Sequence, residues 1–255
     1  MVELKAPAEI EAMRAAGRVV ATALAEIRKQ AAVGVSLAEL DEIARSVLAE
    51  HGATSPFLHY QPSFAHTPFP AVICASVNDA ALHGIPGPYR LADGDLVSID
   101  FGATLDGWTG DSAVSFTVGT PRPADLRLIG IAERALAAGI AKAVPGGRLG
   151  DISAAIGAQA RAAGYGLHTD FGGHGVGRTM HESPSVPNDG KADRGLKLEA
   201  GLVIAIEPWF MAGGHDSYRV DPDGWTLRSG DGSRAAHVEH TVALTSAGPQ
   251  ILTGL

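Results

Sequence analysis

The chain has 255 residues, 45% of them hydrophobic, and its 28 acidic against 20 basic side chains give a formal net charge of −8. This acidic balance, without a basic stripe, argues against a nucleic-acid-binding surface, because phosphate contacts need Lys and Arg. The single Cys74 excludes an internal disulfide framework, and we expect a cytoplasmic protein, since the sequence shows neither a signal peptide nor an apolar run of bilayer-spanning length.

Two amphipathic helices are predicted in the first part of the chain. One apolar stripe runs from Ile10 to Ile27 with the spacing of a helix. A capping box, Ser36-x-x-Glu39, predicts the start of a second helix, whose apolar positions continue to Val47. A helix pair therefore precedes the first strand that carries a carboxylate.

That strand and its partner are predicted to form a hairpin. The first strand is apolar, and we expect it to end at Asp100, ahead of a turn at Gly102. Residues 104–108 are typical of a hairpin turn, and the second strand is expected from Asp111 to Val118. The hairpin would bring both carboxylates to one end. Taken alone, Asp100 could equally cap a loop, which is the common role of Asp at a turn.

A second helix pair is predicted further along the chain. An apolar stripe runs from Leu126 to Ile140, a break follows at residues 145–147, and another stripe begins at Leu149 and includes Ile156. The second half thus repeats the order of the first, two helices followed by strands.

Three polar residues stand out in the strands that follow. His174 lies among glycines, which let the backbone approach a ligand or metal, although such a segment could also be a flexible loop. Glu207 and Glu239 lie in apolar strands, where Glu is rarely buried unless it is paired or bound to a metal.

Residues 91–100 align with residues 198–207, and both segments end in a carboxylate. This similarity predicts an internal duplication, with halves of roughly 1–120 and 121–255 in a single domain. We expect an α/β (α+β) sandwich, in which helix pairs cover curved, mainly antiparallel sheets and the carboxylates gather where the halves meet.

One imidazole and four carboxylates suit a pair of divalent cations. Oxygen ligands with one nitrogen favour manganese, iron, cobalt or zinc. Four carboxylates within about 4 Å would repel by roughly 4 kcal/mol per pair at an effective dielectric near 20, so protons or cations must neutralise them. The candidate ligands are Asp100, Asp111, His174, Glu207 and Glu239.

The other histidines divide into two groups. His181 lacks a second His four residues later, so the helical zinc motif fails, and we interpret it as a donor to substrate. His83 lies in a turn and could be an ordinary loop histidine, although His83-Gly-Ile-Pro and His181-Glu-Ser-Pro are similar. His240 is expected to face away from the carboxylates. The remaining histidines expected to be solvated are His51, His59 and His215.

Several segments together resemble the type I methionine aminopeptidases of peptidase family M24, in order and spacing, over the chain from about Ile10 to Thr245. The resemblance implies the pita-bread fold, two cations bridged by a hydroxide, and removal of the initiator methionine from nascent proteins, with a small second residue preferred. The segments are Asn78-Asp-Ala-Ala-Leu-His83-Gly-Ile-Pro, Asp-Leu-Val-Ser-Ile-Asp100, Gly-Trp-Thr-Gly-Asp111, Gly-Gly-His174-Gly-Val-Gly-Arg, Met-His181-Glu-Ser-Pro, Ile-Glu207-Pro and Val-Glu239-His-Thr.

The resemblance also implies ligand roles. Asp111 and Glu239 would bridge both ions, Asp100 would chelate one, and His174 with Glu207 would complete the other.

Catalytic roles follow from metal chemistry. Glu207 is the candidate proton acceptor, His181 would stabilise the oxyanion, and His83 would contact the scissile amide nitrogen. By resemblance, the apolar pocket for the methionine side chain is assigned to Phe69, Cys74, Met180 and Trp225, with Tyr60 as a further candidate.

One segment departs from the family pattern. The stretch from Phe57 to Pro70 is longer than usual, which leaves open the places of Tyr60, His66 and Thr67 and could reshape the pocket. We expect a monomer that acts on N-terminal methionyl peptides and nascent chains, with contact to the ribosome exit region left open.

Two other functions compete with this prediction. An Xaa-Pro dipeptidase uses a similar metal set but normally carries a large additional N-terminal domain. A metal-free peptide-binding module on the same fold would have lost ligands.

Overall fold

The computed structural model describes residues 2–254, which contain a helix pair, four strands, a second helix pair and nine further strands, in that order. The helices are α1 (Pro7–Gln30), α2 (Leu37–His51), α3 (Pro123–Lys142) and α4 (Leu149–Ala163). The strands are β1 (Ile73–Val77), β2 (Ala80–Leu82), β3 (Leu96–Leu105), β4 (Trp108–Thr117), β5 (Gly173–Gly175), β6 (Glu182–Val186), β7 (Val203–Ile206), β8 (Trp209–Met211), β9 (Tyr218–Val220), β10 (Leu227–Ser229), β11 (Ala235–His237), β12 (His240–Thr245) and β13 (Gly248–Ile251).

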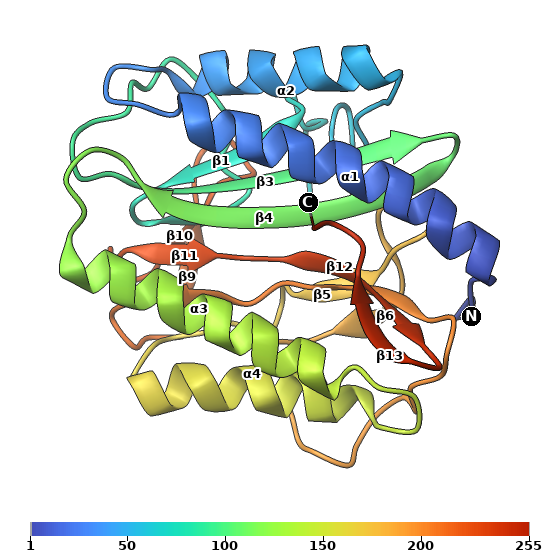
Figure 1. Ribbon diagram of the computed structural model, residues 1–255. Helices are drawn as coiled ribbons and strands as arrows, with labels where there is room; N and C mark the ends of the chain where they lie inside the picture. Colours follow the sequence, from blue (N-terminus) through green and yellow to red (C-terminus); the bar gives the residue numbers. More distant parts are fainter. Residues whose placement is uncertain (1, 255) are drawn as a thin grey trace.

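The strands form antiparallel sheets between two helix pairs (Figure 1). α1 and α2 lie outside the sheet β1-β3-β4, whereas α3 and α4 lie on the opposite side of the molecule, beyond the sheet β13-β12-β7-β5-β6. Smaller sheets, β2-β10-β9 and β11-β8, complete the central layer. The prediction of an α+β fold with helix pairs over antiparallel sheets is confirmed. The two aligned segments contribute to β3 and β7, in separate sheets, and the duplication itself stays a prediction.

Each helix pair packs its own hydrophobic core. In the first half, Leu24 of α1 and Ile99 of β3 belong to one buried cluster. In the second half, Ile156 of α4 and Ile206 of β7 belong to another, and Gly139 of α3 lets the three elements approach, because a Cβ there would lie 3.0 Å from Ile156. Burying one such side chain contributes roughly 1.5–3 kcal/mol, so these two clusters hold the layers together.

The helix ends agree with the local signals. The Ser36 side chain accepts a hydrogen bond from the Glu39 amide, and the Glu39 carboxylate accepts one from the Ser36 amide, which is the predicted capping box. The apolar stripe of α3 differs from the prediction at Leu126, which is 51% exposed. The neighbouring Asp125 is buried instead, because its carboxylate pairs with Arg234 at 2.6 Å.

The hairpin of β3 and β4 is longer than predicted. β3 continues past Asp100 to Leu105, and Gly102 lies within it, paired with Asp111. The turn consists of Asp106 and Gly107, both with positive φ, as a two-residue hairpin turn requires. The expectation that the first strand ends at Asp100 was therefore wrong, and both carboxylates lie in the middle of the paired strands.

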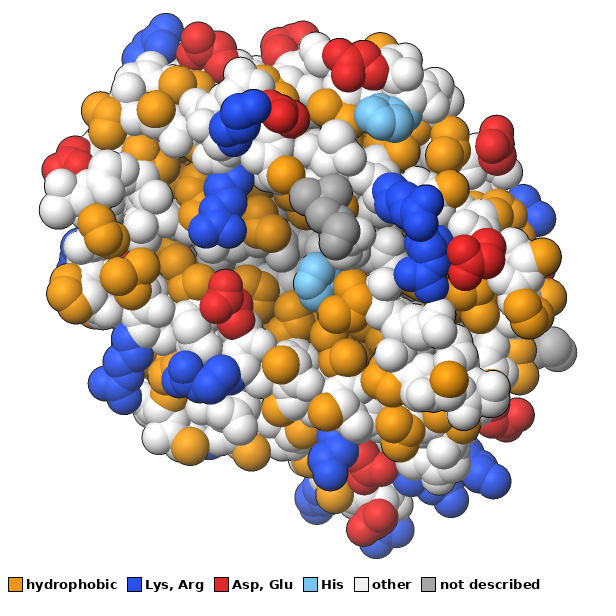
Figure 2. Space-filling model, in the orientation of Figure 1, with side chains coloured by type: hydrophobic (Ala, Val, Ile, Leu, Met, Phe, Trp, Pro, Cys, Tyr) orange, Lys and Arg blue, Asp and Glu red, His pale blue; other side chains and the backbone are white. Residues whose placement is uncertain are grey.

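None of the helices within residues 2–254 is long and apolar enough to span a bilayer. The face of the molecule drawn in Figure 2 carries acidic and basic side chains interspersed with apolar ones.

Candidate active site

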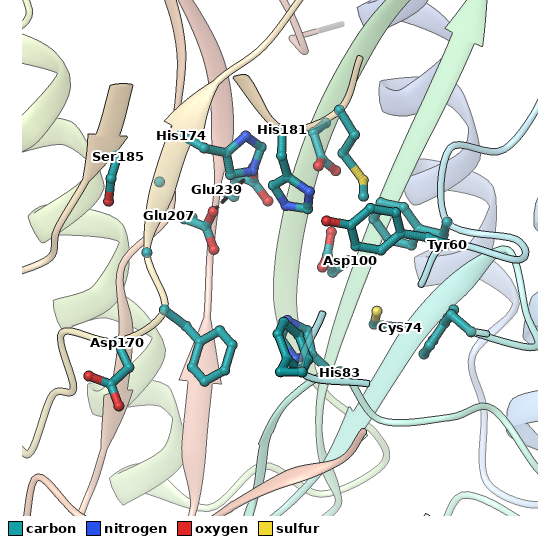
Figure 3. Close-up of a pocket in the computed structure, with 18 of the residues that line it drawn as sticks. Tyr60, Cys74, His83, Asp100, Asp170, His174, His181, Ser185, Glu207 and Glu239 are labelled. Carbon is teal, nitrogen blue, oxygen red and sulfur yellow. Dashed lines mark ion pairs between the residues drawn. The ribbon is translucent and has the colours of Figure 1, made fainter. Parts of the chain in front are cut away.

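A cavity of about 680 Å³ lies between the two halves (Figure 3). The predicted metal ligands, the two candidate catalytic histidines and the four pocket residues all line it, and so does Tyr60. They are Asp100, Asp111, His174, Glu207, Glu239, His83, His181, Phe69, Cys74, Met180 and Trp225. His66 and Thr67 do not contribute to the lining. Residues nominated from segments far apart in sequence thus meet in one place.

The carboxylates reach the cavity from strands of both halves. Asp100 lies on β3 and Asp111 on β4, whereas Glu207 directly follows β7 and Glu239 lies between β11 and β12. Backbone hydrogen bonds fasten the halves here, because the Glu239 amide donates to the Ala113 carbonyl at 2.9 Å. The hydroxyl of Thr241 also accepts from the Asp111 amide at 2.9 Å and donates to its carbonyl at 2.7 Å. The sheet backbone, rather than side-chain packing alone, sets the carboxylate positions.

Two groups of side chains could hold cations. In one, a ligand atom from each of Asp111, His174 and Glu239 lies within 4.8 Å of the others. In the other, the same holds for Glu207, His237 and Glu239.

Several oxygens are free to bind such ions. Asp100 Oδ1, Asp111 Oδ1 and Glu239 Oε1 are buried and have no hydrogen-bond partner among the described residues. Buried carboxylate oxygens without donors are costly, and a divalent cation would satisfy them. The residues present therefore fit a metal centre.

The acidic groups strongly perturb one another. Burial, followed by the neighbouring Glu207 charge, raises the pKa of Asp111 to about 8. Burial and the Asp111 charge raise the pKa of Asp100 and of Glu239 well above their usual values. Burial also opposes the charge on Glu207, but the adjacent imidazoles of His237 and His174 outweigh it, so its pKa is lowered. A carboxylate cluster of this kind favours the binding of positive charge.

His83 and His181 approach the carboxylates from two sides (Figure 3). His83 follows β2 in a left-handed conformation with φ of 55°, which agrees with the predicted turn. His181 precedes β6, and its ring centroid lies 4.2 Å from that of His174. Desolvation lowers the pKa of His83 to about 4. The His181 side chain is exposed at the cavity, and desolvation followed by the neighbouring His174 lowers its pKa to about 3. Both rings are neutral near pH 7.

The four nominated pocket residues form one hydrophobic cluster. Phe69, Cys74, Met180 and Trp225 are all buried in it, with Tyr60 packed against them. The rings of Phe69 and Trp225 meet edge to face with centroids 5.1 Å apart. The cavity therefore has a charged side and an apolar end.

Sequence reasoning missed His237. This residue is buried, and its Nε2 lies 3.5 Å from Glu207 Oε2, while His174 Nε2 lies 3.4 Å from Glu207 Oε1. The signal was available, because His237 precedes Glu239 by two residues, and alternate residues of an extended chain share a face. His240, by contrast, lies outside the cavity lining, with its Nδ1 2.9 Å from Thr253 Oγ1. His51, His59 and His215 are exposed.

Comparison with known proteins identifies the family. A model of Metallopeptidase family M24 matches residues 11–246. The chain is 50% identical to "Methionine aminopeptidase 1" of Mycobacterium tuberculosis over 260 aligned residues, which cover 99% of this chain and 95% of that protein. It is 43% identical to "Methionine aminopeptidase" of Aquifex aeolicus, over 100% of this chain and 99% of that protein.

The fold agrees with these sequence matches. The crystal structure of methionine aminopeptidase from Thermotoga maritima superposes with a TM-score of 0.94 at 36% identity, and the match covers 100% of both chains. The chain therefore belongs to metallopeptidase family M24 and, within it, to the methionine aminopeptidases.

Proposed function

We propose that this protein is a dinuclear metal-dependent aminopeptidase that removes the N-terminal methionine from peptides and nascent chains, with preference for a small second residue. The observation that carries the proposal is the single cavity in which the carboxylate cluster, two neutral histidines and an apolar pocket meet. The names of the relatives support the same activity.

Two divalent cations, whether manganese, iron, cobalt or zinc, would be held by the cavity's carboxylates and His174. Asp111 and Glu239 would bind both ions, Asp100 would bind one, and His174 with Glu207 would complete the other. The unpartnered oxygens of Asp100, Asp111 and Glu239 support this arrangement. When bound, the cations supply Lewis acidity that polarises the scissile carbonyl and lowers the pKa of water at the site.

The protein's own groups move the protons and stabilise charge. Glu207 accepts the proton of the attacking water and passes it to the leaving amine nitrogen as the C–N bond breaks, and its lowered pKa keeps it ionised for the first step. His181, neutral at pH 7, donates an N–H to the developing oxyanion. His83, also neutral, contacts the scissile amide nitrogen from the other side of the cavity.

The apolar end selects the first residue. Met180 and Cys74 offer polarisable sulfur, and Phe69 and Trp225 offer ring edges and faces, all of which suit a thioether side chain. The buried cluster closes the cavity behind that side chain, so the substrate's free amine stays near the carboxylates. This arrangement explains why the enzyme would remove one residue from an end.

Two further properties follow from this function. Initiator methionine is exposed as chains leave the ribosome, so we propose action in the cytoplasm, near the ribosome exit region. We also propose that the protein acts as a monomer.

A peptide assay tests the proposal against its main alternative, an Xaa-Pro dipeptidase. The purified protein, first stripped of metal and then supplied with manganese, iron, cobalt or zinc, is incubated with Met-Ala-Ser and with Xaa-Pro peptides. We expect release of free methionine that depends on metal, and little cleavage of Xaa-Pro. If Xaa-Pro peptides were cleaved faster than Met-Ala-Ser with several metals, the protein would be assigned as an Xaa-Pro dipeptidase and not as a methionine aminopeptidase.

A further inference from the structure

The rim of the cavity carries an aromatic side chain that the proposed chemistry does not use. Phe64 belongs to the long segment of residues 57–70, which we call the rim loop, and it lines the cavity although 53% of it is exposed. A large apolar side chain costs free energy when it faces water, and a half-exposed one at a cavity mouth is a candidate contact for a ligand.

The rim loop holds Phe64 in a defined place. The amide of His59 donates to the Phe69 carbonyl, and the amide of Phe69 donates to the Tyr60 carbonyl, both at 2.8 Å, so the two ends of the loop are paired. Trp225 Nε1 donates to the Thr67 carbonyl at 3.0 Å, which ties the loop to the apolar pocket. These bonds position the loop tip over the cavity.

Phe64 closes a ring of four aromatic side chains. Its centroid lies 5.8 Å from that of Phe171 and 5.9 Å from that of Trp225, and both contacts are edge to face. His83 completes the ring, with centroids 5.3 Å from Phe171 and 6.3 Å from Trp225. The four rings connect the methionine pocket at Trp225, the amide-contacting His83 and the cavity mouth.

A substrate chain must pass this ring. With the first side chain against Trp225 and the scissile amide at His83, the remaining residues leave toward the mouth, each advancing about 3.5 Å in extended form. On this path the second residue would lie near Phe171, and the third would lie near Phe64.

Resting on the proposed function, we propose that Phe64 is a specificity-determining residue that binds an apolar or aromatic side chain at the third position of the substrate. The partly exposed rings of Phe64 and Phe171 form the contact surface, and burying them against the substrate is the source of the preference.

The test compares kcat/KM for Met-Ala-Phe and Met-Ala-Ser in the metal-loaded enzyme. The wild-type protein should favour Met-Ala-Phe by about two- to tenfold, the range of one aromatic contact. Phe64→Ser should bring this ratio close to one, and Phe64→Trp should preserve it. The matched control is Leu126→Ser, which removes an equally exposed apolar side chain from α3 and should leave the ratio as in the wild type.

The outcomes separate the inference from the proposed function. Absence of methionine release from either peptide by the wild-type enzyme would refute the function itself. Release with equal efficiency from both peptides, or an equal fall for both in Phe64→Ser, would refute the role of Phe64, because the loop would then only support the fold.

Discussion

The floor and the rim of the cavity are built in opposite ways. The floor consists of Asp100 and Asp111 on the paired strands β3 and β4, and of Glu239, whose amide is hydrogen-bonded to Ala113 of β4. Asp111 and Glu239 are buried. The rim is the loop of residues 57–70, whose tip residue Phe64 is half exposed. Carboxylates that are proposed to share cations need positions set by a sheet, whereas a loop can vary in length without disturbing them. Substitutions in the floor should therefore abolish activity, whereas substitutions in the rim loop should change substrate selectivity.

The largest effect is expected at the floor. Asp111→Asn keeps the shape of the side chain but removes a charge that both cations would share, so bound metal and turnover should both fall to background. Elemental analysis beside a Met-Ala-Ser assay measures the two quantities. Asp106→Asn is the matched control, because it makes the same change at the exposed turn of the same hairpin and should leave both unchanged. Retention of full metal content in Asp111→Asn would contradict its role as a ligand.

Substitution of His181, at the edge of the floor, should lower turnover without lowering metal content. His181→Ala removes a proposed oxyanion donor but no proposed ligand, so metal content should persist while kcat falls about 100- to 1,000-fold. His66→Ala, on the rim loop but outside the cavity lining, is the control and should have nearly normal kcat. Loss of metal from His181→Ala would make His181 a ligand, and near-normal kcat would exclude a role in the reaction.

The residue behind the floor should have a smaller effect. His237 lies 3.5 Å from Glu207, so His237→Ala removes a group that orients and stabilises that carboxylate. Metal affinity or kcat should fall about 10- to 100-fold, as for other groups that hold a ligand in place. Metal titration followed by the peptide assay measures both. His240→Ala removes an imidazole that lies outside the cavity lining, and an equal loss there would show that the effect is general destabilisation.

The smallest effect concerns stability, and it depends on pH. The folded protein raises the pKa of Asp111 to about 8 from an ordinary 3.8, so between these pH values the folded state binds this proton more than the unfolded state does. The lowered pKa values of His83 and His181 act in the opposite direction below pH 6.5. Stability of the metal-stripped protein should therefore fall as pH rises from about 7 to about 9. Cations should abolish this fall, because they neutralise the floor, and at 100 times their dissociation constant they add about 2.7 kcal/mol.

Urea unfolding at about pH 7 and about pH 9, with chelator and with readded metal, measures this linkage. The same urea midpoint in all four conditions would contradict the hypothesis that protons or cations neutralise the carboxylates of the floor. Phe64→Ser should not alter the pH dependence, since the rim loop carries none of the cavity carboxylates.

Much of the molecule follows from local sequence signals. The four helices and the capping box at Ser36 were accessible to sequence reasoning, because helix periodicity and capping depend on neighbouring residues. The motifs around His174 and Glu239 were informative for a similar reason, since each is a short segment with unusual polar content.

Only the tertiary structure decided how distant segments meet. The hairpin continues past Asp100 because β3 and β4 pair over their whole length, and Thr241 then joins the hairpin to β12 across 130 residues of sequence. Strand register likewise decides the contact of His237 with Glu207. The conformation of the rim loop decides the contact of Phe64 with Phe171. Such contacts are absent from local patterns, because they arise from pairing and packing between segments whose separation in sequence carries no signal of their proximity.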